Sequence, residues 1–103
     1  MARAIIKGTG SYTPPKVLKN DFFEAVGSSD EWIFKNLGIK ERRIAVGEVT
    51  SDLASKAALE ALKDAGINAA EVDLIIVATS TPDRQAPSTA CFVQEKIKAP
   101  NSV

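Results

Sequence analysis

The sequence predicts an α/β fold in which helices cover a parallel sheet. Residues 72–79, VDLIIVAT, form a nearly continuous apolar run rich in β-branched side chains, which is typical of a strand buried on both faces. Helical patterns lie on either side of this run, over 50–65 and 87–97. A further short strand is predicted at 4–6, and this mixture of strands and helices is the element order of an α/β protein.

The short strand predicted at 4–6 leads into the glycine pair Gly8 and Gly10. A dinucleotide-binding fingerprint would place a third glycine at position 13 and open a helix there. That residue is Thr13, and the two prolines at 14–15 mark a loop instead. We therefore expect the glycines to permit a tight turn and close backbone packing.

Two short helices are expected next. The first covers 20–26, with Asn20 as its cap and Gly27 at its end. The second begins at a capping box, the S-x-x-E pattern of 28–31. It ends at Gly38, a residue suited to the left-handed conformation that closes many helices.

The second short helix has two faces of interest. Ile33 and Leu37 lie four residues apart and can pack inward. Ser28, Trp32 and Asn36 lie four apart on another face, which places a hydroxyl, an indole and an amide in one row. This row is either a ligand-binding face or a half-buried tryptophan beside a capping serine and a solvated amide.

The charged segment 38–45 is expected to be extended, with local ion pairs among its side chains. The alanine-rich helix that follows is the clearest element: Thr50 or Ser51 caps it, Asp52 suits its positive end, and Gly66 ends it. Its apolar stripe is mostly alanine, so whatever packs on it must approach closely. The stripe consists of Leu53, Ala54, Ala57, Ala58, Ala61, Leu62 and Ala65.

The last helix is expected to begin at Pro87 or Ser88, after a loop over 80–86. It includes Cys91, which we interpret as a small buried hydrophobe. Val103 is expected to begin a further strand.

Composition excludes several classes of function. The 103 residues carry 13 basic and 13 acidic side chains, which argues against binding to nucleic acid or to a membrane surface. With no histidine and one cysteine, the chain holds no Ser-His or Cys-His pair, no internal disulfide, no zinc site with histidine ligands and no cysteine cluster for a metal. A single thiol fits a reducing cytoplasm, and the N-terminal apolar run is too short for a signal peptide or a membrane span.

Two sequence blocks are specific enough to suggest a family: SSDEWI at 28–33 and GIKERRIA at 38–45. Four shorter blocks stand in the expected order around them: GTGSYTP at 8–14, AGI at 65–67, VATST at 77–81 and PSTAC at 87–91. Together they resemble the N-terminal part of β-ketoacyl-acyl-carrier-protein synthase III, a condensing enzyme with the thiolase fold.

The resemblance implies that residues 1–103 are the N-terminal segment of a mixed sheet with helices on both faces, with the catalytic core beyond residue 103. It implies a condensing acyltransferase of fatty-acid initiation, which joins an acyl-CoA primer to malonyl-acyl-carrier protein with loss of CO2. Coenzyme A thioester would be a substrate, and no cofactor would be bound permanently. The full-length enzyme would be a cytoplasmic homodimer.

The resemblance assigns no catalytic residue to this chain. The family's cysteine nucleophile would fall shortly after Val103, and its histidine and asparagine would come from the C-terminal half. Cys91 matches a different position of the family. Residues 1–103 are therefore expected to be inactive by themselves.

Four residues match substrate-binding positions of the family. Trp32 would stack on the adenine of coenzyme A, with the Ser28 hydroxyl beside it. Asn36 stands where the family usually has an arginine, and an amide cannot make the charged bidentate contact that a guanidinium makes with phosphate. Ala86 stands where a bulky residue commonly reaches across the dimer and closes the partner's primer pocket, which implies a roomier pocket here.

Two other functions remain open on this sequence. Asn36 and Ala86 also fit a related condensing enzyme of specialised metabolism that takes longer or unusual acyl groups. The third possibility is an α/β binding module without catalytic activity.

Overall fold

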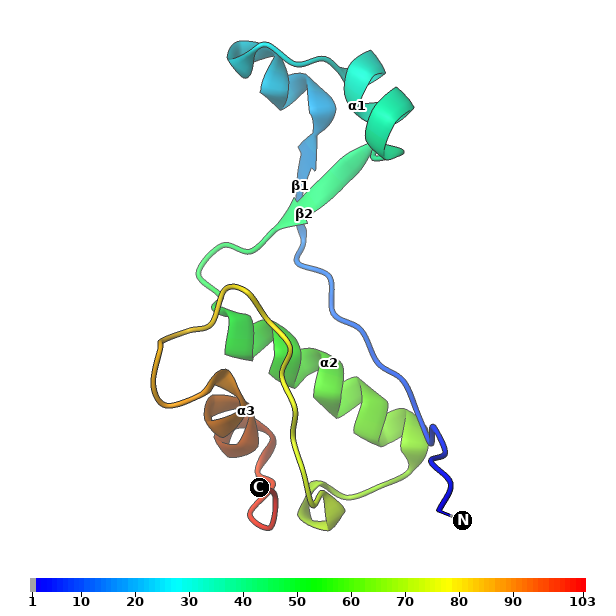
Figure 1. Ribbon diagram of the computed structural model, residues 1–103, viewed down its shortest axis with the longest axis vertical. Coiled ribbons are helices and arrows are strands. Elements are labelled where there is room, and N and C mark those ends of the chain that lie inside the picture. The colour runs from blue at the N-terminus through cyan, green and yellow to red at the C-terminus, as the bar shows by residue number, and fades with distance from the viewer. Residues whose placement is uncertain (1) are drawn as a thin grey trace. The chain divides into compact units, whose positions relative to one another are not determined.

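The computed structural model describes residues 2–103 (Figure 1). The chain forms two compact units. The smaller unit comprises residues 13–47, and the larger one comprises residues 2–12 together with 48–103. Each unit is built around its own set of contacts, and they are described in turn.

The larger unit is built on two packed helices, α2 (Thr50–Ala65) and α3 (Thr89–Ile97), with the short 3-10 turn η2 (Ala69–Glu71) between them. Both helices lie where the apolar periodicity predicts them. The buried centre consists of Val93, Ile97 and Ala99. Half-buried apolar side chains pack around it, from α2 and from the segment that follows η2: Ala54, Ala58, Leu62, Ala69, Val72, Ile75 and Val77.

The glycine pair near the N-terminus packs directly on the backbone of α2. A Cβ atom placed on Gly8 would lie 2.7 Å from the carbonyl oxygen of Ala61, and one placed on Gly10 would lie 2.3 Å from that of Ala57. The alanine-rich side of α2 therefore admits a neighbouring main chain at a distance that only glycine allows. The close packing predicted for both partners is confirmed, whereas the predicted tight turn at the glycines does not form.

The strand predicted over 72–79 is replaced by an extended segment with one covered face. Leu74 and Ile76 are exposed, Ile76 by 81%, while the alternate side chains pack on the helices. The Val103 N–H donates to the Asp73 carbonyl at 2.9 Å, and the Ile75 N–H donates to the Val103 carbonyl at 3.1 Å. These two bonds have the pattern of a parallel pair, so Val103 lies beside the segment, although the strand predicted to begin at Val103 is not formed.

A strand buried on both faces needs neighbours that these residues do not provide. Among residues 2–103, the backbone hydrogen bonds of 73–79 go to Val103 alone. The predicted strand at 4–6 is likewise not formed, and Ile5 and Ile6 are both exposed. The strand predicted from the apolar run is therefore wrong: the backbone is extended, but a sheet forms only where strands pair.

The smaller unit contains a two-stranded antiparallel sheet that the sequence did not indicate. Strand β1 (Lys16–Lys19) pairs with β2 (Glu41–Ile44), with Lys16 opposite Ile44. The 3-10 helix η1 (Asn20–Val26) and helix α1 (Asp30–Leu37) connect the two strands.

The charged segment is extended, as predicted, but its local ion pairs are not formed. In the described residues, the Arg42 guanidinium lies 4.3 Å from the centre of the Phe23 ring, and Arg43 donates to the Pro14 carbonyl at 3.2 Å. The two ion pairs found within 2–103 both belong to the larger unit. The cations of β2 are therefore held by an aromatic face and a carbonyl rather than by carboxylates.

Helix starts differ from the prediction by one or two residues. The cap of α1 is Ser29, so the predicted capping box at 28–31 is wrong. The cap of α2 is Val49 rather than Thr50 or Ser51. Neighbouring residues compete for such positions, and the direction of chain entry decides between them. The predicted ends at Gly27, Gly38 and Gly66 are confirmed, each glycine having a left-handed backbone.

Candidate functional site

Helix α1 exposes the tryptophan of the Ser28, Trp32 and Asn36 row. The Trp32 side chain is 56% exposed and borders an open hollow of about 470 Å³. The other residues of the hollow precede the helix: Val26, Gly27, Ser28 and Ser29. A large aromatic side chain is usually well buried, whereas the Trp32 indole is displayed beside this hollow.

The start of α1 is fixed by Ser29, which leaves Ser28 on the hollow. The Ser29 hydroxyl accepts the Trp32 N–H at 3.1 Å and so satisfies one of the free donors of the first turn. Ser28, which is half-buried, lies at the edge of the hollow and outside the helix. The capping role predicted for Ser28 therefore belongs to its neighbour.

Asn36 is the third residue of the row, and its side chain is hydrogen-bonded to the backbone of its own helix. Its side-chain amide donates to the Trp32 carbonyl at 2.8 Å.

On the other face of α1, Ile33 is buried as predicted, whereas Leu37 is 58% exposed and the inward packing predicted for it is wrong. Leu37 is the last residue of the helix, where the chain is already leaving the core.

A buried amide, missed by sequence reasoning, holds α1 in place. Asn20 is 1% exposed, and its amide donates to the Asp30 carboxylate at 2.9 Å and to the Ile39 carbonyl at 2.6 Å. Its own carbonyl accepts the Arg42 guanidinium at 3.1 Å. Asn20 thus connects η1, the first turn of α1 and β2. The sequence suggested a cap at this position, and the partners come from residues 10 to 22 positions away.

Ala86 lies in the larger unit, in the exposed loop that precedes α3. The Ala86–Pro87 peptide bond is cis. The loop is attached to the start of α2 by hydrogen bonds at Thr81 and Asp83. Ala86 itself is exposed.

The interpretation of Cys91 as a buried hydrophobe is wrong, because the side chain is exposed. The buried residues of α3 are Thr89, Val93 and Ile97, which follow one another at intervals of four. Cys91 lies on the opposite side of this helix. Its sulfur is 3.4 Å from the Ser88 hydroxyl.

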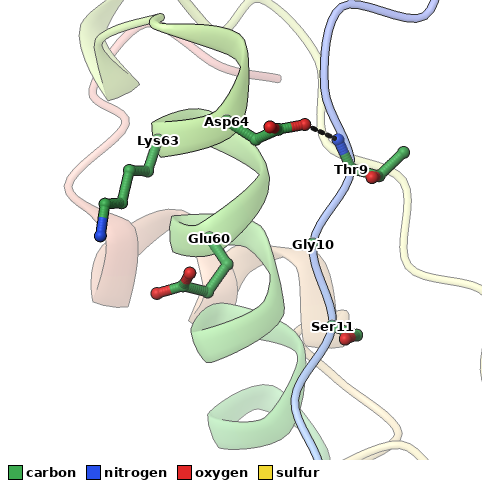
Figure 2. A pocket seen from close by; sticks show the side chains of 6 residues that line it. All are labelled: Thr9, Gly10, Ser11, Glu60, Lys63 and Asp64. Carbon is green, nitrogen blue, oxygen red and sulfur yellow. Dashed lines mark hydrogen bonds between the residues drawn. The ribbon is translucent and has the colours of Figure 1, made fainter.

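A second hollow, between the N-terminal segment and α2, does not assemble a site. Its lining residues are Thr9, Gly10, Ser11, Glu60, Lys63 and Asp64. Asp64 accepts the Thr9 N–H at 3.0 Å, while the Lys63 side chain points away from the segment (Figure 2). Asp64 attaches the N-terminal segment to α2, and the Lys63 side chain does not point toward the same place.

Two ion pairs perturb the titration of surface groups on α2. The Lys56 ammonium contacts the Glu48 carboxylate and the Tyr12 hydroxyl, which lowers the pKa of Glu48 and raises the pKa of Lys56. The Lys96 ammonium, 2.6 Å from the Asp52 carboxylate, lowers the pKa of Asp52, and the Val49 N–H adds to this effect. Both pairs stabilise the start of α2.

Within residues 2–103, no helix is both long and apolar enough to cross a bilayer. In the same residues, no three acidic or cysteine side chains gather as metal ligands would.

The class of protein follows from comparison with solved structures: the chain has part of a thiolase-like condensing-enzyme fold. Solved structures of this class superpose on the chain. The 3-oxoacyl-[acyl-carrier-protein] synthase III of Aquifex aeolicus matches 95% of this chain with a TM-score of 0.88 and 48% identity, over 33% of its own length. The priming β-ketosynthase of the R1128 polyketide pathway matches 95% with a TM-score of 0.89 and 32% identity, over 30% of its length.

Curated relatives identify the particular enzyme that the chain resembles. The β-ketoacyl-[acyl-carrier-protein] synthase III of Clostridium acetobutylicum is 57% identical over 98 residues, which are 94% of this chain and 30% of that protein. That of Clostridium kluyveri is 53% identical over 103 residues, 99% of this chain and 32% of that protein. No family model matches. The predicted resemblance to synthase III is confirmed, and the chain spans about a third of the length of these relatives.

Proposed function

We propose that residues 1–103 belong to a condensing acyltransferase that joins an acyl-CoA primer to malonyl-acyl-carrier protein with loss of CO2. The observation that carries the proposal is 57% identity to a synthase III over nearly the whole chain. The nucleophile and its partners would come from outside these residues. The full-length enzyme would be a cytoplasmic homodimer, using coenzyme A thioester as substrate without a permanent cofactor.

In this proposal α1 forms the mouth that receives coenzyme A. The exposed indole of Trp32 would stack on the adenine, and the Ser28 hydroxyl would lie beside it on the same hollow. Because the hollow is open, it would hold the nucleotide end of the donor while the thioester reaches further into the enzyme. The exposure of Trp32 supports this role over the alternative of a half-buried tryptophan.

A chimeric synthase tests the proposal. Residues 1–103 replace the matching segment of the Clostridium acetobutylicum relative, and condensation is measured with acyl-CoA and with an acyl-pantetheine donor that lacks the nucleotide. Loss of one aromatic stack costs about 1–3 kcal/mol, so Trp32→Ala should lower kcat/KM for acyl-CoA roughly 5- to 150-fold. The acyl-pantetheine reaction should change little.

Phe34→Ala provides the matched control, because Phe34 is an exposed aromatic residue of the same helix outside the row. It should leave both donors nearly unaffected. Equal losses with the two donors in Trp32→Ala would show that Trp32 serves only the fold, and an inactive wild-type chimera would overturn the proposed activity.

Ala86 is proposed to border the primer pocket of the partner subunit. An alanine leaves space that phenylalanine would fill, and each methylene in a hydrophobic pocket is worth about 1–3 kcal/mol. In the chimera, Ala86→Phe should shift the ratio of kcat/KM values from octanoyl-CoA toward acetyl-CoA. Gln85→Phe, on the same exposed loop, is the control. An unchanged ratio in a folded, dimeric Ala86→Phe protein would contradict the pocket assignment.

A condensing enzyme of specialised metabolism is the second candidate. It is favoured by Asn36 and Ala86, and by the match to a priming β-ketosynthase of a polyketide pathway. The identity to that protein is 32%, against 57% for the synthase III of Clostridium acetobutylicum, which favours fatty-acid initiation. Efficient use of acetyl-CoA by the chimera would support the first candidate, and rejection of acetyl-CoA in favour of longer groups would support the second.

A further inference from the structure

The loop between the extended segment and α3 is attached to the first turn of α2 by a set of short hydrogen bonds. The Ser51 N–H donates to one oxygen of the Asp83 carboxylate at 2.8 Å, and the Ser51 hydroxyl donates to the other at 2.5 Å. The Thr50 hydroxyl donates to the Thr81 carbonyl at 2.6 Å. The carboxylate of Asp83 therefore caps α2 from a distance of 32 residues in the sequence.

The centre of this attachment, Ser51, is buried and hydrogen-bonded. Ser51 is completely buried, and its hydroxyl oxygen also accepts the Lys96 ammonium at 2.6 Å. The same ammonium contacts the Asp52 carboxylate. A cation from α3 thus lies next to the negative charge that Asp83 brings to the positive end of α2. Alanine at position 83 would leave a buried hydroxyl and a helix N–H without their acceptor, and asparagine would leave the hydroxyl without one.

Asp83 also marks the boundary between the attached and the exposed parts of the loop. Its backbone N–H donates to the hydroxyl of Thr89, a buried residue in the first turn of α3, at 3.3 Å. Residues 84–87 follow, and all four are exposed. Ser88 then caps α3. The four exposed residues 84–87, here named the crown, therefore lie between two anchored positions, Asp83 and Ser88. Asp83 anchors the first end of the crown.

We propose that Asp83 is a positioning residue that sets the place of the crown, and through it the primer preference associated with Ala86. The proposal rests on the proposed function, because primer preference has a meaning only in a condensing enzyme. Asp83 would touch no substrate. It would act by fixing the backbone three residues before Ala86, so that a small side chain there leaves a pocket of definite size.

Trypsin tests the attachment without any catalytic activity, because Arg84 is the first residue of the crown. Cleavage after Arg84 is followed by mass spectrometry in folded residues 1–103. Loss of a helix-capping acceptor should raise the cleavage rate roughly 2- to 30-fold in Asp83→Ala. Asp83→Asn, which keeps an acceptor for the Ser51 N–H but not for its hydroxyl, should give an intermediate rate.

Asp64→Ala is the matched control, since the Asp64 carboxylate, at the other end of α2, also accepts a backbone N–H, that of Thr9. It removes the bond to Thr9 and should leave cleavage after Arg84 unchanged. An equal rise in Asp64→Ala and Asp83→Ala would mean that general loosening, and not the Asp83 attachment, exposes the crown. No rise in either Asp83 variant would also overturn the proposal.

The second measurement is primer preference in the chimeric synthase described above. Asp83→Ala should change the ratio of kcat/KM values for octanoyl-CoA and acetyl-CoA by about tenfold or more, with Asp83→Asn between it and the wild type. The Asp64→Ala ratio should match the wild type. An active chimera whose ratio is the same in all Asp83 variants overturns the positioning role alone. A wild-type chimera without condensing activity overturns the proposed function and removes the basis for the role of Asp83 in primer choice.

Discussion

The side-chain amide of Asn36 donates a 2.8 Å hydrogen bond to the carbonyl oxygen of Trp32, one turn earlier in α1. The amide nitrogen is therefore engaged within the same helix that carries the indole we propose as the adenine platform. No positive charge stands at this point of the row, in contrast to the arginine that the resemblance leads one to expect. Coenzyme A would be held here by stacking more than by charge.

Asn36→Arg should strengthen the use of acyl-CoA in the chimeric synthase. A guanidinium would release the Trp32 carbonyl and bring a cation to the exposed face of α1, where it can meet a phosphate. The gain should appear as a lower KM for acyl-CoA at low ionic strength and should shrink as salt screens the pair. Asn36→Gln, which adds length without charge, is the control. An unchanged KM for Asn36→Arg at low salt would place position 36 away from the ligand.

Gly10→Ala should destabilise the larger unit. The added Cβ atom would lie 2.3 Å from the Ala57 oxygen and the Ala61 nitrogen, and these are backbone atoms of α2 that cannot move aside alone. Overpacking of this kind costs about 1–3 kcal/mol. Urea unfolding followed by circular dichroism should show the loss, with Ser11→Ala on the exposed neighbour as the control. Equal stability of Gly10→Ala and the wild type would refute the close approach.

The helices were predictable because their signals are local. The alanine stripe of α2, with its period of 3.6 residues, and the left-handed glycines at 38 and 66 each depend on a few neighbouring residues. The strands were not predictable in this way, because a strand forms only where a second strand pairs with it. The apolar run at 72–79 pairs only at Val103 among residues 2–103, while the highly charged β2 finds β1.

The candidate site shows the same difference between features set by neighbouring residues and features set by distant partners. The spacing of Ser28, Trp32 and Asn36 predicts one helical face, but α1 begins at Asp30 and Ser28 precedes it. Ser28 and Trp32 line the same hollow, and Asn36 does not. Asn20 and Asp83 escaped sequence reasoning, since their partners are brought to them by the fold. Cys91 was misplaced because a cysteine near the start of a helix gives no indication of which side of the helix will be covered.

The pH dependence of stability should follow the two ion pairs of α2. The pKa of Asp52 is lowered below 3.8 by Lys96 and by the Val49 N–H, so the folded state is favoured above that value. This contribution is lost as pH falls through the lowered pKa. The pKa of Lys56 is raised above 10.5 by Glu48 and Tyr12. Its contribution is present below 10.5 and is lost as pH rises through the raised pKa.

Urea midpoints measured across the pH range test both signs. Asp52→Asn should flatten the acid limb of the stability profile and leave the alkaline limb unchanged. Lys56→Met should flatten the alkaline limb. If both variants follow the wild-type profile, with the midpoint merely displaced, the ion pairs do not contribute to the pH dependence.

Asn20→Ala should destabilise the smaller unit and loosen the helix that carries Trp32. The substitution deprives the Ile39 carbonyl and the Arg42 guanidinium of a buried partner, at a cost of about 1–3 kcal/mol. Trp32 is the only tryptophan of the chain, so its fluorescence during urea unfolding reports on α1 directly. Asn36→Ala is the matched control, because it removes an exposed amide from the same unit, and such surface changes stay within about 0.5 kcal/mol. If the two alanine variants unfold at the same urea concentration, the buried network around Asn20 does not hold α1 in place.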